Sequence, residues 1–300
     1  MTRRTVLVTG ATGKQGGAVA RALLAAGHDV VALTRNPKHP SAAVLVAAGA
    51  RLTQGDFRHA ESLLPALREV DTLYLMGTPY GSSVEEEVTQ GIAAVDAARQ
   101  ARIGHLIYGS VAGADTATGI PHFDSKSRIE RHIAGTGIDA TISAPAAFMD
   151  FLNPALVDGL RQGELRMALS ATRPLQYVSV TDIGRFVASL VERRQGVFGR
   201  RIEIAGDELT GPQTAATLSL ASGRDIRYAP FPAAALRAYD EDLAAMFEWF
   251  ERDGYSVDRA VLAREFPEIP WQSVADWARE QDWVAALSAH DQPQPAASGR

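Results

Sequence analysis

The sequence predicts an α/β chain in which a doubly wound parallel sheet is followed by a smaller C-terminal α/β subdomain. Short apolar segments alternate with amphipathic segments through the first half, a pattern typical of strands buried on both faces and helices that cover them. A glycine-rich run directly follows the first apolar segment. The chain has 300 residues, of which 46% are hydrophobic, enough to bury the core of one or two domains.

The first half is predicted to hold six strands and five helices, joined by right-handed crossovers. The predicted strands are residues 5–9, 29–33, 51–54, 72–76, 105–108 and 140–143. The predicted helices are residues 14–26, 41–48, 60–68, 84–101 and 125–134. Helical spacing of Val19, Ala22 and Leu23 gives the first helix an apolar face. The helix ends are indicated by glycines that follow them, namely Gly27, Gly49 and Gly135.

Three consecutive glutamates, Glu85 to Glu87, open the fourth predicted helix. Negative side chains stabilise the positive N-terminal end of a helix. We attribute the acidic run to this effect and to no specific site.

The second half is less regular and alternates irregularly between strands and helices. The predicted strands are residues 165–167, 176–180 and 201–204. The predicted helices are residues 147–161, with an interruption at Pro154 left open, 181–193, 211–221, 233–252, 258–265 and 271–286. We therefore divide the chain into a sheet domain at residues 1–150, a smaller subdomain at 151–287 and a disordered tail at 288–300.

Composition excludes several classes of function. The net charge is −5 and no basic block accompanies it, which argues against direct nucleic-acid binding. The chain has no cysteine, so disulfides, thiolate nucleophiles and cysteine metal sites are excluded, and no metal site is predicted. No segment approaches the roughly 20 apolar residues of a membrane span, and the apolar run after the N-terminal arginines is too short for a signal peptide. A cytoplasmic protein without a membrane partner is expected.

The glycine-rich run predicts a phosphate-binding loop at the start of the first helix. Gly10 permits a tight turn, Gly13 allows close approach of a pyrophosphate, and Gly16 allows the helix to pack against the strand. The predicted contacts of a dinucleotide here are Gly10, Thr12, Gly13, Lys14, Gln15 and Gly16. A purely structural glycine turn is one alternative. A nucleoside triphosphatase loop is another, but it requires Ser or Thr after the lysine, where Gln15 stands.

The residues after the second and third predicted strands indicate which dinucleotide binds. Sites selective for NAD place an acidic residue about 20 positions beyond the glycine loop, but Arg35 stands there. A guanidinium suits a 2′-phosphate, so we expect NADP(H) to be preferred over NAD(H), with Lys38 adding a second charge. Asp56 and Phe57 are predicted to lie near the adenine. A solvated surface arginine and a loop-capping aspartate are the alternatives.

Six short segments spread along the chain carry a family resemblance. They are residues 8–17, 34–37, 55–57, 122–126, 144–149 and 178–184. Together they resemble the NmrA-like family, an atypical branch of the short-chain dehydrogenases/reductases, over about residues 5–285. The resemblance implies a Rossmann-type domain that binds NAD(P).

The resemblance also implies where the catalytic groups lie. Ordinary members of the wider superfamily use a Tyr-x-x-x-Lys pair, in which the tyrosine gives a proton and the lysine holds the nicotinamide ribose, together with an upstream serine. None of the seven tyrosines here has a lysine four residues later; His122 stands at that spacing before Lys126. Lys126 is implied to bind the ribose, and Ser110 stands where the serine is expected. His122 could supply the proton, or it could be a helix-start histidine that meets solvent or a carbonyl.

Two further groups of residues are expected near the nicotinamide. The predicted contacts are Gly77, Thr78 and Pro79 after the fourth strand, and Pro145 and Phe148 after the sixth. Apolar residues are expected either to form a flat pocket wall or to pack in the core, namely Phe148, Met149, Phe151 and Phe231.

The resemblance implies two functions, because some relatives in the family look like quinone reductases and others are regulators that bind the cofactor and contact a protein partner. The first is an NADPH-dependent oxidoreductase for a quinone or another small aromatic substrate, since a quinone accepts hydride without a strong positioned acid. The second is a non-catalytic NADP(H) sensor or regulator that acts through a protein partner, and the missing tyrosine favours it directly.

Overall fold

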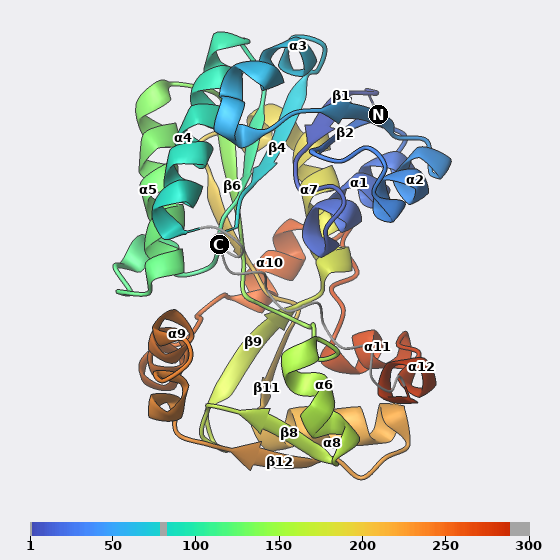
Figure 1. The fold of residues 1–300 in the computed structure, drawn as a ribbon, viewed down its shortest axis with the longest axis vertical. Coiled ribbons are helices and arrows are strands. Elements are labelled where there is room, and N and C mark those ends of the chain that lie inside the picture. The colour runs from blue at the N-terminus through green and yellow to red at the C-terminus, as the bar shows by residue number, and fades with distance from the viewer. Residues whose placement is uncertain (1, 79–82, 289–300) are drawn as a thin grey trace.

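The chain forms a sheet domain and a smaller part that lies beside the carboxyl ends of its strands (Figure 1). The computed structural model describes residues 2–78 and 83–288. The tail predicted at 288–300 lies outside the described residues except for Ser288. Within the described residues, no helix combines the length and the apolar character needed to cross a bilayer.

The central sheet has seven parallel strands in the order β10-β6-β5-β4-β1-β2-β3. They are β1 (Thr5–Val8), β2 (Asp29–Thr34), β3 (Arg51–Gln54), β4 (Thr72–Met76), β5 (Leu106–Gly109), β6 (Ala140–Pro145) and β10 (Arg201–Ile204). In register, Val6 of β1 lies between Val30 and Thr72. The strand order reverses between β1 and β4, and the carboxyl edge at such a switch point is where ligands bind in sheets of this kind. The predicted fold class is confirmed.

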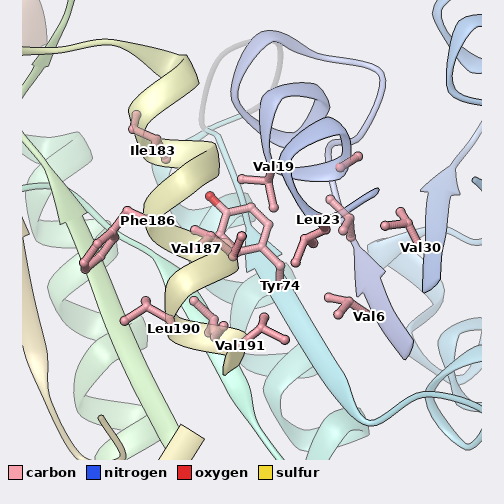
Figure 2. Close-up of a cluster of buried hydrophobic side chains, with 14 of the residues drawn as sticks. Val6, Val19, Leu23, Val30, Tyr74, Ile183, Phe186, Val187, Leu190 and Val191 are labelled. Atoms are coloured by element: carbon pink, nitrogen blue, oxygen red, sulfur yellow. The ribbon is translucent and has the colours of Figure 1, made fainter. Parts of the chain in front are cut away.

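Helices cover both faces of this sheet. One face carries α1 (Lys14–Ala25), α2 (Pro40–Ala47), α7 (Val180–Arg193) and α10 (Arg259–Glu265). The other carries η1 (Phe57–Leu63), α3 (Leu64–Leu67), α4 (Val84–Gln100) and α5 (Pro121–Thr136). Figure 2 shows α1 and α7 packed side by side over β1, β2 and β4. Leu23 and Leu190 are fully buried there, and each such side chain contributes about 1.5–3 kcal/mol.

Strand β10 belongs to the large sheet and helix α7 packs on it, although both come from residues 151–287, the range predicted to form the smaller subdomain. A Cβ on Gly184 of α7 would lie 2.6 Å from the Ala18 carbonyl oxygen of α1, so the two helices approach at backbone distance. The chain thus leaves the sheet domain after β6 and returns to it before entering the smaller part again. The boundary at residue 150 stays a prediction.

The smaller part contains two small sheets surrounded by helices (Figure 1). The strands are β7 (Ala147–Phe148), β8 (Glu164–Met167), β9 (Pro174–Val178), β11 (Asp207–Thr210) and β12 (Arg227–Pro230). The helices are α6 (Pro154–Arg161), α8 (Gly211–Ser222), η4 (Ala233–Leu236), α9 (Glu241–Arg252), α11 (Val274–Arg279) and α12 (Trp283–Ser288). Its core joins the sheet domain through Phe123 of α5. The Phe123 ring packs edge-on against the Trp249 ring, with 5.6 Å between the two ring centres.

Three long helices predicted in the second half are wrong in extent. Residues 147–148 form a strand, and α6 begins at Pro154 because the Asn153 side chain accepts hydrogen bonds from two backbone N–H groups of its first turn. The helix predicted at 233–252 is split because Asp240 caps a new helix. The helix predicted at 271–286 starts later, because Ser273 opens α11 with a capping box, and it is split between Arg279, where α11 ends, and Trp283, where α12 begins.

Helix α5 also differs from its prediction. It begins at Pro121, a residue well suited to a first turn, and runs to Thr136. Gly135 therefore lies inside the helix, and Gly137 ends it with a φ of +70°. The earlier start places His122, Lys126 and Glu130 at successive turns of one helix.

Candidate functional site

A pocket of about 290 Å³ opens at the carboxyl edge of the sheet, beside the switch point. It is bounded by the ends of β1, β2 and β4, the turn after β3 and the first turns of α4. The residues predicted to bind the cofactor that line it are Gly10, Thr12, Arg35, Asp56, Phe57, Gly77 and Thr78. The structure thus brings together residues from four separate loops that the sequence assigned to one ligand.

The glycine loop forms a tight cradle at the mouth of this pocket. Gly10 has a φ of +61°, and a Cβ there would lie 2.7 Å from Met76 Sδ. A Cβ on Gly16 would collide with the Gly10 carbonyl and lie 2.6 Å from the Thr9 carbonyl oxygen. Helix α1 begins at Lys14 with Gly13 as its N-cap, and the N-cap makes no side-chain hydrogen bond to the first turn, which leaves backbone N–H groups at the positive end of the helix for a ligand. The cradle fits a phosphate group.

The Lys14 and Gln15 side chains turn to protein partners instead of the loop. Lys14 Nζ lies 2.5 Å from Asp150 Oδ2, in the segment that connects β7 with α6. Gln15 Nε2 donates to the Tyr74 hydroxyl at 2.9 Å. Their side chains thus fix the start of α1 to the smaller part and to β4, and the cofactor contacts predicted for them stay predictions.

Arg35 and Asp56 lie at the outer rim of the pocket. Arg35 is exposed at the end of β2, and the described residues offer its guanidinium no hydrogen-bond or ion-pair partner. Asp56 Oδ1 accepts from the Arg58 N–H at 3.0 Å and so caps η1, the alternative considered for it. Arg58 also lines the pocket, and Glu86 pairs with it at 2.9 Å. Lys38 is exposed and does not line the pocket.

A buried ion pair lies at the inner wall of the pocket. Lys126 Nζ of α5 bonds to Glu87 Oε1 of α4 and donates to the Gly77 carbonyl at 2.8 Å. The other carboxylate oxygen, Oε2, accepts from the Ser125 hydroxyl at 2.6 Å. The Glu87 side chain is 1% exposed and that of Lys126 10%. Glu87 and Gly77 line the pocket, whereas Lys126 is not among the lining residues and lies behind them.

Sequence reasoning missed Glu87 because it treated the acidic run as one unit. The helical period separates the three glutamates: Glu87 falls on the face of Val88, Gly91 and Ala94, which packs inward. Glu85, in contrast, is 72% exposed and pairs with Arg128. An acidic residue at an apolar position of the helix was the signal that could have found it.

Tyr108 of β5 forms the inner end of the pocket and was also missed. Its hydroxyl is buried without a hydrogen-bond partner among the described residues, and its ring centre lies 6.0 Å from Lys126 Nζ. Burial raises the pKa of Tyr108 well above its ordinary value, so the phenol stays protonated. The spacing between tyrosine and lysine along the chain does not reveal Tyr108, because its neighbour Lys126 lies on an adjacent element.

Ser110 and His122, the two other predicted catalytic residues, are held by acidic side chains and do not line the pocket. The Ser110 hydroxyl donates to Glu130, whose other oxygen accepts from Arg201 Nε at 3.0 Å. Burial raises the pKa of Glu130. His122 Nδ1 lies 2.7 Å from Asp242 Oδ2 on α9 of the smaller part. Both side chains are therefore already hydrogen-bonded to a carboxylate, and neither is a free proton donor.

The residues expected near the nicotinamide are distributed between the two parts of the molecule. Pro145 is buried at the end of β6, where its carbonyl accepts from Ala112 at 2.9 Å, and Phe148 is 37% exposed on β7. Pro79 lies outside the described residues. Of the apolar residues considered for a pocket wall, Met149 and Phe151 are both 2% exposed and pack in the core. Phe231 lines a separate cavity beside α9.

Comparison with known proteins gives a family. The sequence model of the NmrA-like family matches residues 2–278. An NmrA-like family domain-containing protein of Dictyostelium discoideum is 26% identical over 86% of this chain and 92% of its own length. The NAD(P)H azoreductase of Xenophilus azovorans is 28% identical over 74% of this chain and 76% of its own.

Two solved structures have the same fold. The NADPH-dependent quinone oxidoreductase QOR2 of Escherichia coli, complexed with NADPH, superposes with a TM-score of 0.75 at 26% identity, covering 91% of this chain and 98% of that one. The negative transcriptional regulator NmrA, in complex with NADP, superposes with a TM-score of 0.77 at 20% identity, covering 95% and 100%. At that identity the second likeness concerns the fold alone.

Proposed function

The chain belongs to the NmrA-like family, and from that premise we propose that it is an NADPH-dependent reductase of small, electron-poor aromatic compounds such as quinones. The observation that carries the proposal is the glycine cradle at the start of α1, which opens into a pocket with Arg35 at its rim. The relatives named for azo and quinone reduction support the class of acceptor.

Each part of NADPH has a group of residues in or beside the pocket that could bind it. The pyrophosphate would lie against the uncapped N-terminus of α1, and the 2′-phosphate would meet the Arg35 guanidinium. The adenine would lie beside Phe57 in the turn after β3. Lys126, behind Gly77, would hold the nicotinamide ribose. The cofactor supplies the hydride, and these residues bind and orient it.

Ser110 and His122 are both hydrogen-bonded to carboxylates, which favours a hydride acceptor that needs no proton donor fixed beside it. A quinone takes one hydride from NADPH and one proton from solvent to give the hydroquinone and NADP⁺. Since His122 is bonded to Asp242 and Ser110 to Glu130, a proton from water suits this site better than one from either side chain.

Turnover is the test of this proposal. The purified protein is mixed with NADPH and a panel of quinones without oxygen, and the absorbance of the reduced nicotinamide is followed. We expect one NADPH to be oxidised for each quinone reduced. Tight NADPH binding without oxidation by any quinone would contradict the reductase and favour a sensor.

A sensor is the second candidate, and two contacts favour it. The Lys14–Asp150 and His122–Asp242 bonds tie the cofactor side of the sheet domain to the smaller part. A dinucleotide that rearranged either contact would bias the position of the smaller part, and a protein partner could read that change.

Arg35→Asp is expected to reverse the preference between the two cofactors. Loss of a charged hydrogen bond to the 2′-phosphate should weaken NADPH binding about 10- to 100-fold, while NADH binding changes less than about threefold. Calorimetric titration with both cofactors measures this. Arg68→Asp, the same charge change at an exposed position outside the pocket, is the control. An unchanged NADPH-to-NADH ratio in Arg35→Asp would refute the assignment.

A further inference from the structure

The two oxygens of the buried Glu87 carboxylate are each bound by one of two consecutive residues of α5. Ser125 donates to Oε2 at 2.6 Å, and Lys126 bonds to Oε1. The carboxylate thus joins α4 to α5 at a single place, with 1% of its side chain exposed. A group so buried and so bonded has one orientation, and it fixes the Lys126 ammonium with it.

The ammonium group has three N–H donors, which together with the bond to Cε point to the corners of a tetrahedron. One goes to the Gly77 carbonyl at 2.8 Å and one to Glu87. A Cβ on Gly77 would lie 3.2 Å from Glu87 Oε1, so this glycine lets the end of β4 come close to the pair. These two acceptors use two of the three N–H donors, and both acceptor residues, Gly77 and Glu87, line the pocket, while Lys126 itself lies behind them.

Other groups around Lys126 do not compete for its charge. Tyr108 of β5 presents its ring at 6.0 Å, and burial raises the pKa of its phenol, which stays neutral. On α5 itself, His122 is paired with Asp242 and Glu130 with Arg201. Glu87 is therefore the charged group that sets the position of Lys126.

We propose that Glu87 is a positioning residue, which holds Lys126 with its third N–H aimed at the hydroxyls of the nicotinamide ribose. This inference rests on the proposed binding of NADPH. In the proposed arrangement Glu87 would contact neither the adenosine nor the phosphates, and it would act on the nicotinamide half of the cofactor through Lys126.

The test compares NADPH with adenosine 2′,5′-bisphosphate, a fragment that lacks the nicotinamide riboside. Glu87→Gln keeps the shape of the side chain and removes its charge. It should raise the dissociation constant for NADPH about tenfold, the equivalent of one hydrogen bond to a charged group, and that of the fragment less than twofold. Glu85→Gln, on the exposed face of the same helix, should change neither.

Ser125→Ala is a second variant that keeps both charges, in case Glu87→Gln does not fold. It removes the hydrogen bond to Glu87 Oε2 and should weaken the binding of NADPH about threefold, again without effect on the binding of the fragment. Equal weakening of both ligands, or no change for NADPH, in the variants that fold would overturn the inference. Failure of the unaltered protein to bind NADPH would instead overturn the proposed function, and the inference with it.

Discussion

Lys126→Met is expected to lower the free energy of unfolding by about 3–5 kcal/mol, because it leaves the Glu87 carboxylate buried without its cation. The side chains are 10% and 1% exposed, so solvent cannot replace the lost partner. Methionine has nearly the length of lysine and fills the same space, which limits the effect of lost packing. Urea unfolding followed by circular dichroism measures the change.

The matched control is the double variant Lys126→Met with Glu87→Gln. It removes both charges and should recover most of the loss, since replacement of a whole buried ion pair by neutral groups is often close to neutral. Lys38→Met, at an exposed lysine, should stay within about 0.5 kcal/mol of the unaltered protein. Equal destabilisation in the single and double variants would mean that the charge of Glu87 is not what Lys126 compensates.

Gly16→Ala is expected to abolish measurable NADPH binding and to lower the free energy of unfolding by about 3 kcal/mol, at the upper end for an overpacked site. The new Cβ would meet the carbonyls of Gly10 and Thr9, which are backbone atoms and cannot rotate away. Helix α1 must then move off the strand, and the phosphate cradle opens. Equilibrium dialysis with NADPH and urea unfolding measure the two effects.

Gly135→Ala is the corresponding control. Gly135 lies inside α5, and apart from its chain neighbours and its own helix backbone no atom of the described residues lies within 4 Å of the place of a Cβ, so the substitution should stabilise the protein by about 0.5–1 kcal/mol and leave binding unchanged. If Gly16→Ala bound NADPH as tightly as Gly135→Ala does, the glycine loop would not be the phosphate site.

The sheet domain was predictable because its signals are local. Strand β4 is an apolar run after its first residue, Thr72, and the loop from Gly10 to Gly16 follows strand β1 closely. The return of α7 and β10 to this sheet was not predictable in the same way. It depends on contacts between residues far apart in sequence, such as Gly184 against Ala18.

The smaller part shows the same limit. Strands β7 and β11 are two and four residues long and gain their hydrogen bonds from β9, a partner that no local pattern reveals. The site divides similarly. Arg35 and Asp56 could be found because each follows a recognisable strand, whereas the partners of His122 and Lys126 come from other helices and appear only when the chain is folded.

The most direct test of the central claim, that the pocket at the switch point binds NADP(H), is a calorimetric titration of the unaltered protein with NADPH. The predicted result is saturation at one NADPH per chain, with tighter binding than NADH and displacement by adenosine 2′,5′-bisphosphate. The absence of saturable binding, or equal affinity for NADH, would contradict it.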